Sequence, residues 1–283
     1  MPNLPLTSTY VRRVNADEVN AALGPFDELN PIGDRSGSGE CWVARIGADL
    51  QAVKIVVHEH EPGRFEREVG ALARLDSPRV MRVRDHGTVT VAAGTFPYLR
   101  SEFVPGGDLS GHIASGPPPD DSTMRGFLIE LLTGLAELAD ARIVHRDLKP
   151  ENIILRDGDW SQPVVIDLGL SRLVDTTSFT VYPWAVGTWP YMAPEQLRAE
   201  RATALSDVWA AAVVASEVAA GTHPYFRGEL AIPPDWHGRL AVTPTVSGAR
   251  PAALRDWIAS GAHYRAYRRP SAARSVRQLE ETW

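Results

Sequence analysis

Cysteine is nearly absent from this sequence, since Cys41 is the only one among 283 residues. A single thiol cannot form an intramolecular disulfide, which excludes small secreted domains held together by such bonds and fits a reducing compartment. Long apolar runs are lacking too: the most apolar segment, residues 208–215, runs into Ser216 and Glu217 and is too short to span a bilayer. We therefore predict no membrane segment and a buried helix over this stretch.

The N-terminus lacks the features of a secretion signal, and the chain lacks an excess of positive charge. Residues 1–10 have neither a basic start nor a long apolar stretch, so we expect a cytoplasmic protein. The 29 Lys and Arg residues against 35 Asp and Glu residues give a formal net charge of −6, which argues against general nucleic-acid binding. The length allows one large domain or two lobes.

Residues 143–155 (IVHRDLKPENIIL) place a cluster of charged residues between two apolar runs. Such runs predict buried strands, so the polar residues lie on a rigidly held loop. A second apolar run ends at Asp167, and Asp147, Asn152 and Asp167 are then expected to converge. Converging oxygen ligands suit Mg²⁺ bound with substrate phosphates. We predict phosphoryl transfer, with Asp147 accepting a hydroxyl proton and Lys149 neutralising the charge that develops on the transferred group.

The segment HRDLKPEN, residues 145–152, resembles the catalytic loop of eukaryotic-like, bacterial-type Ser/Thr protein kinases, and residues 167–169 (DLG) stand where this family has Asp-Phe-Gly. The alternative is that Asp147 and Asn152 only shape turns. The resemblance implies an α+β bilobal protein-kinase fold: a small antiparallel β-sheet N-lobe with one main helix and a larger, mainly helical C-lobe. It also implies ATP and Mg²⁺, or Mn²⁺, between the lobes, with Asn152 and Asp167 as metal ligands.

Residues 33–39 (GDRSGSG) form a glycine-rich stretch between strands expected at 26–32 and 40–46. Small residues let backbone N–H groups approach a polyphosphate. The resemblance places Gly39 at the end of the family's glycine-rich loop, and it places Cys41 where a valine would touch the adenine.

This loop departs from the family pattern, because Ser36 and Asp34 occupy the positions of its first two glycines. Three alternatives stay open. The loop has one extra residue and binds phosphate through Gly33 and Gly37, or it binds ATP weakly, or it is a plain hairpin turn.

The strand expected at residues 51–57 carries a lysine inside an apolar run, where a cation needs a partner. Ala52 and Lys54 resemble the family's Ala-x-Lys, whose lysine holds the α- and β-phosphates. A helix expected at about residues 63–75 offers Glu68 as the partner of Lys54.

Residues 98–108 (YLRSEFVPGGD) read as a strand that stops in a Pro/Gly turn. The resemblance makes this the hinge, with backbone groups of Glu102 and Val104 facing the adenine and Ser101 behind it. Asp108 either contacts the ribose or caps a helix. The predicted divisions are an N-terminal extension (1–25), an N-lobe (26–103) and a C-lobe (104–283).

The N-terminal extension contains a short predicted helix. Asn15 and Glu18 are spaced as a capping box, and Gly24-Pro25 ends the helix. This helix either packs on the N-lobe or binds a partner.

Residues 187–195 (GTWPYMAPE) resemble the family's substrate-facing segment, which includes Thr188. The resemblance pairs Glu195 with the late Arg269 and makes Asp207 a structural residue at the start of the buried helix.

The resemblance also predicts a phosphate pocket formed by Arg146 and Arg172. The candidate phosphorylation sites are the hydroxyl residues of the preceding loop: Thr176, Thr177, Ser178 and Thr180. The alternative is that Arg146 pairs with a carboxylate such as Asp175.

The sequence as a whole predicts a protein Ser/Thr kinase that acts on protein substrates and on its own activation loop, within a homodimer. A pseudokinase that serves as a binding module is the main alternative, supported by the irregular glycine loop and Leu168 and opposed by the catalytic and metal-binding residues named above. A small-molecule kinase is disfavoured by Lys149-Pro150 and by residues 187–195.

Overall fold

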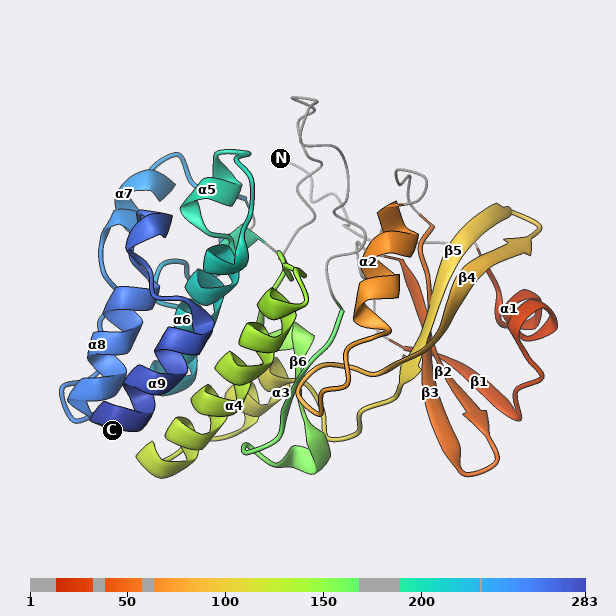
Figure 1. Ribbon diagram of the computed structural model, residues 1–283, viewed down its shortest axis with the longest axis horizontal. Coiled ribbons are helices and arrows are strands. Elements are labelled where there is room, and N and C mark those ends of the chain that lie inside the picture. The colour runs from red at the N-terminus through yellow and green to blue at the C-terminus, as the bar shows by residue number, and fades with distance from the viewer. Residues whose placement is uncertain (1–13, 33–38, 58–63, 168–188, 230) are drawn as a thin grey trace, which may run out of the picture.

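The protein has two lobes side by side, a sheet lobe and a helical lobe (Figure 1). The computed structural model describes residues 14–32, 39–57, 64–167, 189–229 and 231–283. The sheet lobe comprises the five-stranded sheet with helices α1 and α2, and the helical lobe comprises the rest of the chain from α3 onward.

The sheet is antiparallel throughout, with the strand order β1-β2-β3-β5-β4. Its strands are β1 (Glu28–Ile32), β2 (Glu40–Ile46), β3 (Asp49–Ile55), β4 (Val83–Val91) and β5 (Gly94–Glu102). The sequence predicted four of these strands and missed β4. This strand lies at the sheet edge, and Val89 is its only buried residue, so the alternation that reveals a strand is too weak there.

Helix α1 (Ala16–Leu23) covers the outer face of the sheet beside β1 and β4 (Figure 1). Asn15 and Glu18 form the predicted capping box. The carboxylate of Glu18 also accepts a hydrogen bond from the N–H of Ala92, at 3.1 Å. Val19 is buried in a cluster with Trp42 and other side chains of the sheet. Of the two alternatives for this helix, the structure shows packing on the sheet lobe.

The helical lobe is built around two long helices. Its elements are α3 (Leu109–Ser115), α4 (Asp121–Asp140), β6 (Ile153–Leu155), β7 (Pro163–Val165), α5 (Pro194–Leu197), α6 (Ala204–Ala220), α7 (Trp236–Ala241), α8 (Ala252–Gly261) and α9 (Ala272–Thr282). The predicted apolar stripe of α4 is buried along its whole length, and α6 is buried nearly all round. No helix in the described ranges is both long and apolar enough to cross a membrane.

Helix α2 (Arg64–Leu72) lies between the sheet and the helical lobe (Figure 1). Its buried residues Phe65, Val69 and Leu72 belong to the same apolar cluster as the core of the helical lobe. Burial of this stripe fixes α2 against both lobes.

The turn after α2 is fastened to α4 by Arg79. The guanidinium of Arg79 donates to Glu130 at 2.7 Å and to Glu137 at 3.1 Å. The side chain of Arg79 also lies so close to Gly134 that a Cβ there would approach it to 2.9 Å. The carbonyl of Arg79 accepts the N–H of Val165, at 2.8 Å. This turn is therefore a fixed point between the lobes.

We expect the free energy of unfolding to fall in acid, because of a buried histidine in the turn that follows α6. The Nδ1 atom of His223 accepts the N–H groups of Tyr225 and Phe226, at 3.2 and 3.1 Å, and burial lowers the pKa of His223 to about 4. His223 binds a proton near pH 6.5 in the unfolded chain but only near pH 4 in the folded protein. The free energy of unfolding is therefore highest above pH 6.5 and falls as the pH falls toward 4. We expect a loss of about 2 kcal/mol at pH 4.5 relative to pH 7.

The matched variant is His223→Asn, whose side-chain oxygen accepts the same two N–H groups without titrating. Urea unfolding at both pH values measures the effect. A variant that loses as much stability in acid as the parent would show that His223 is not the group responsible.

Candidate active site

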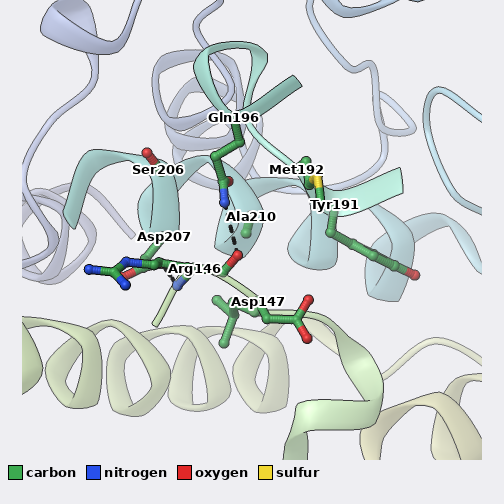
Figure 2. Close-up of a pocket in the computed structure, with 9 residues that line it drawn as sticks. Arg146, Asp147, Tyr191, Met192, Gln196, Ser206, Asp207 and Ala210 are labelled. Atoms are coloured by element: carbon green, nitrogen blue, oxygen red, sulfur yellow. Dashed lines mark hydrogen bonds between the residues drawn. The ribbon is translucent and has the colours of Figure 1, made fainter. Parts of the chain in front are cut away.

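The segment His145–Asn152 is held by the buried carboxylate of Asp207 in α6 (Figure 2). The N–H groups of His145 and Arg146 donate to the two oxygens of Asp207, at 2.8 and 2.9 Å. Burial raises the pKa of this carboxyl group, while His145 and the two N–H donors act in the opposite direction. The loop that precedes Asp147 is therefore attached to the centre of the helical lobe.

Asp147, Lys149 and Asn152 lie together on this loop. The amide nitrogen of Asn152 donates to the carbonyl of Asp147 at 2.7 Å and lies 3.4 Å from its carboxylate. The ammonium group of Lys149 lies 3.6 Å from the same carboxylate. Because the Asn152 nitrogen faces a carbonyl, its Oδ1 is left to act as an acceptor or metal ligand. The predicted base and cation are thus adjacent.

Asp167 is brought to the same place by the strand pair β6–β7. The N–H of Ile166 donates to the carbonyl of Asn152, and the carbonyl of Ile166 contacts Nε2 of His145, each at 2.9 Å. Asp167 follows with φ +54°, in the left-handed region that non-glycine residues rarely adopt. Its side chain is thereby directed at the sheet lobe, where it forms an ion pair with Lys54.

Lys54 lies on β3 and is almost completely buried. Burial disfavours its charged form, but the carboxylates of Asp167 and Asp147 outweigh this effect and raise the pKa of Lys54. The side chain is therefore cationic at neutral pH. The sequence did not predict its pairing with Asp167, which is 113 positions away.

The predicted nucleotide residues Cys41, Ala52 and Lys54 share one face of the sheet. Cys41 is the cross-strand partner of Lys54, and Ala52 lies two residues before Lys54 on the same strand. Gly39 precedes them with φ +143°, and a Cβ there would come within 2.4 Å of the Ile55 carbonyl oxygen. Glycine is thus required at this position by both space and conformation.

The hinge is anchored to the helical lobe by a pair that the sequence did not reveal. The carboxylate of Glu102 lies 3.3 Å from the guanidinium of Arg156, which follows β6. The N–H of Val104 has no hydrogen-bond partner among the described residues. The side chain of Asp108 accepts the N–H of Gly111 at 2.9 Å and so caps α3. Of the two alternatives for Asp108, the structure shows the helix cap.

The amide oxygen of Asn152 and the carboxylate of Asp167 are the groups that could hold a divalent cation. Mg²⁺ binds proteins through one or two such oxygen ligands and completes its coordination with water and phosphate. The available set fits this requirement, because the hydrogen bond of the Asn152 nitrogen fixes which atom of the amide is the acceptor.

Residues 35–241 match the sequence profile of the protein kinase domain. The chain belongs to the protein kinase family. The match covers most of the chain and includes the loop with Asp147, the Lys54 strand and the segment that ends at Glu195.

Two bacterial members of the family illustrate the similarity. The kinase is 31% identical over 214 residues to Serine/threonine-protein kinase pkn2 of Myxococcus xanthus, covering 71% of this chain and 25% of pkn2. It is 28% identical over 264 residues to Probable serine/threonine-protein kinase PkwA of Thermomonospora curvata, covering 91% of this chain and 34% of PkwA. The chain thus spans about a quarter to a third of these relatives.

A solved structure confirms the predicted fold class. The crystal structure of Rad53 residues 1–466 in complex with AMP-PNP matches with a TM-score of 0.69 and 25% identity, covering 88% of this kinase and 64% of that chain. The bilobal protein-kinase fold, with an antiparallel sheet in one lobe and mainly helices in the other, is therefore established.

Several predicted residues of this kinase lie outside the described part of the chain. These are Gly33, Gly37, Arg172, Thr176, Thr177, Ser178, Thr180 and Thr188. Glu68 lies within α2, but its side chain is likewise outside the described part. The two registers of the glycine loop, the Lys54–Glu68 pair and the phosphate pocket at Arg146 remain predictions.

Glu195 and Arg269 form a buried, bidentate ion pair in this kinase. The two guanidinium nitrogens donate to the two carboxylate oxygens at 2.6 and 2.9 Å. The hydroxyl of Ser206 donates to Glu195 as well, at 2.8 Å. Burial opposes ionisation of Glu195, but Arg269 outweighs it and lowers the pKa of the carboxyl group. The pair connects residues 189–195 to the segment that precedes α9.

Proposed function

We propose that the chain is an active protein kinase that transfers the γ-phosphate of ATP to Ser and Thr hydroxyl groups of proteins, with Mg²⁺ as cofactor. One observation carries this proposal: five charged or polar groups from both lobes are brought to one place. Lys54 pairs with Asp167, Lys149 and Asn152 contact Asp147, and the N–H of Ile166, next to Asp167, donates to the carbonyl of Asn152. A binding module would not need all five groups in one place.

The reaction forms a bond between the acceptor oxygen and the γ-phosphorus and breaks the bond between this phosphorus and the bridging oxygen to the β-phosphate. Asp147 orients the acceptor hydroxyl and receives its proton. Lys149, beside Asp147, neutralises charge that develops on the transferred group. Lys54 supplies positive charge to the α- and β-phosphates. Mg²⁺, held by Asn152 and Asp167, would neutralise the phosphate oxygens when bound.

Phosphorylation of the chain by itself is part of the proposal. The acceptors are the hydroxyl residues of the loop that follows Asp167, and one copy of a homodimer would modify the other. Arg146 and Arg172 would hold the added phosphate through charge-assisted hydrogen bonds. A serine or threonine is favoured as acceptor because Lys149 and Thr188 match the Ser/Thr pattern of the family.

Replacing Lys54 with Met is expected to lower phosphate transfer by at least about 100-fold, because the phosphates lose a cation in a buried site. Transfer from γ-labelled ATP to the chain and to a generic Ser/Thr substrate measures this, and mass spectrometry locates the product on Ser or Thr residues. Chelation of Mg²⁺ should abolish transfer as well. The control is Arg277→Met, which removes a cation from an exposed position on α9 and should leave transfer at the parent's rate. A parent protein that binds ATP but transfers no phosphate would instead be a pseudokinase.

A further inference from the structure

Gln196 joins the substrate-facing segment to the catalytic loop through its side-chain amide (Figure 2). Its Oε1 accepts the N–H of Ala193 at 3.1 Å, and its Nε2 donates to the carbonyl of Arg146 at 2.9 Å. An N–H group needs an oxygen acceptor and a carbonyl needs an N–H donor, so the two contacts together fix the orientation of the amide. The first bond caps the short helix α5, while the second reaches 50 positions back along the chain.

The carbonyl that Gln196 contacts belongs to a residue in an unfavourable conformation. Arg146 has φ +66°, in the left-handed region that a side chain with a Cβ rarely adopts. Such a conformation persists only where the surroundings hold it. The N–H of Arg146 is held by Asp207 and its carbonyl by Gln196, and the next residue is Asp147. The two bonds therefore fix the peptide group on each side of Arg146.

The two residues that bond the backbone of Arg146 come from different parts of the kinase. Asp207 belongs to α6, in the centre of the helical lobe, whereas Gln196 follows directly on the segment that resembles the family's substrate-facing region. In Figure 2, Tyr191 and Met192 of that segment lie on the same side of Arg146 as Gln196. A shift of this segment is thus transmitted to the Arg146 carbonyl through one amide.

We propose that Gln196 is a positioning residue that couples the placement of residues 189–195 to the orientation of Asp147; the inference rests on the proposed function. Without the Nε2 donor, the peptide between Arg146 and Asp147 loses the bond that its carbonyl accepts and keeps the one that its N–H donates to Nδ1 of His145, at 3.2 Å, so it is held less firmly. The carboxylate of Asp147 then meets the acceptor hydroxyl less often in a reactive geometry, and small misplacements of this kind have large effects on rate.

The decisive variant is Gln196→Glu, which keeps the shape and the acceptor for Ala193 but places an oxygen against the Arg146 carbonyl. A residue that only caps α5 would tolerate this change. We expect kcat to fall by about 10-fold, with the KM for ATP within about 2-fold of the parent and the melting temperature nearly unchanged. Gln196→Met, which loses both hydrogen bonds, should lose activity to a similar extent. Gln278→Glu, on the distant helix α9, should behave like the parent.

A second measurement separates this inference from the proposed function. Hydrogen exchange of the Arg146 and Asp147 amides reports the order of the loop whether or not the parent transfers phosphate, and Gln196→Glu should speed this exchange by about 10-fold. Parent-like kcat or parent-like exchange in Gln196→Glu would overturn the inference. An inactive parent whose exchange responds as expected would count against the proposed function alone.

Discussion

Replacing Asp147 with Asn is expected to reduce kcat for phosphate transfer by at least about 100-fold, with the fold intact. Asn has the same shape but cannot accept the proton of the acceptor hydroxyl, and positioned acid–base groups contribute about 100- to 10,000-fold to rates. The fold should survive, because the shorter bond from Asn152 is to the backbone carbonyl of this residue, at 2.7 Å, and an Asn side chain keeps an oxygen for the longer contact at 3.4 Å. Steady-state kinetics with a Ser/Thr peptide, together with thermal unfolding, measures both effects.

The matched control is Asp140→Asn, which removes the same charge from the exposed end of α4, outside the group of residues that contact Asp147 in the described structure. It should retain the parent's rate and stability. Unchanged turnover in Asp147→Asn would remove this residue from the reaction and, with it, the catalytic assignment of the loop.

Arg269→Met is expected to destabilise the kinase by about 3 to 5 kcal/mol, because it leaves the carboxylate of Glu195 buried without its cation. The guanidinium also donates to the carbonyls of His263 and Leu205, at 2.8 and 2.9 Å, and lies 5.0 Å above the ring of Trp209. These groups lose their partner as well. The melting temperature should fall by roughly 10 °C for a chain of this size.

The double variant Glu195→Gln with Arg269→Met tests the reason for this loss. Removing both charges abolishes the uncompensated carboxylate, so the double variant should be more stable than Arg269→Met alone. Arg198→Met provides the control, since its pair with Glu200 is exposed and such pairs contribute little. Equal losses in the single and double variants would mean that packing, and not charge pairing, explains the effect of Arg269.

The sequence predicted the parts of the site that are local in the chain. The loop around Asp147 and the strand with Lys54 each carry a continuous motif, and both were placed correctly on their elements. The contact between Lys54 and Asp167 was missed, because the two residues are brought together only by the packing of two lobes. Arg156 was missed for the same reason, since an arginine after a short strand has no local feature that predicts a partner in the hinge.

Other differences between expectation and structure have local causes. Strand β4 has one buried residue, so its sequence lacks the alternation typical of a half-buried strand. Asp108 was left with two alternatives, and the structure shows one of them: its side chain accepts an N–H group at the start of a helix, where such groups need acceptors. The sequence did not indicate a role for Gln196. A glutamine on a short helix is common, and its contact with the carbonyl of Arg146 is visible only in the folded structure.

The attachments at Arg79 and at Glu102 have a mechanical consequence. Arg79 ties the turn that follows α2 to α4, and Glu102 ties the hinge to Arg156. Two fixed points define a line, and rotation about that line leaves both ion pairs intact, whereas sliding along it breaks them. Such a rotation would, however, change the distance between Lys54 and Asp167, so the ion pair between these two residues resists opening of the lobes.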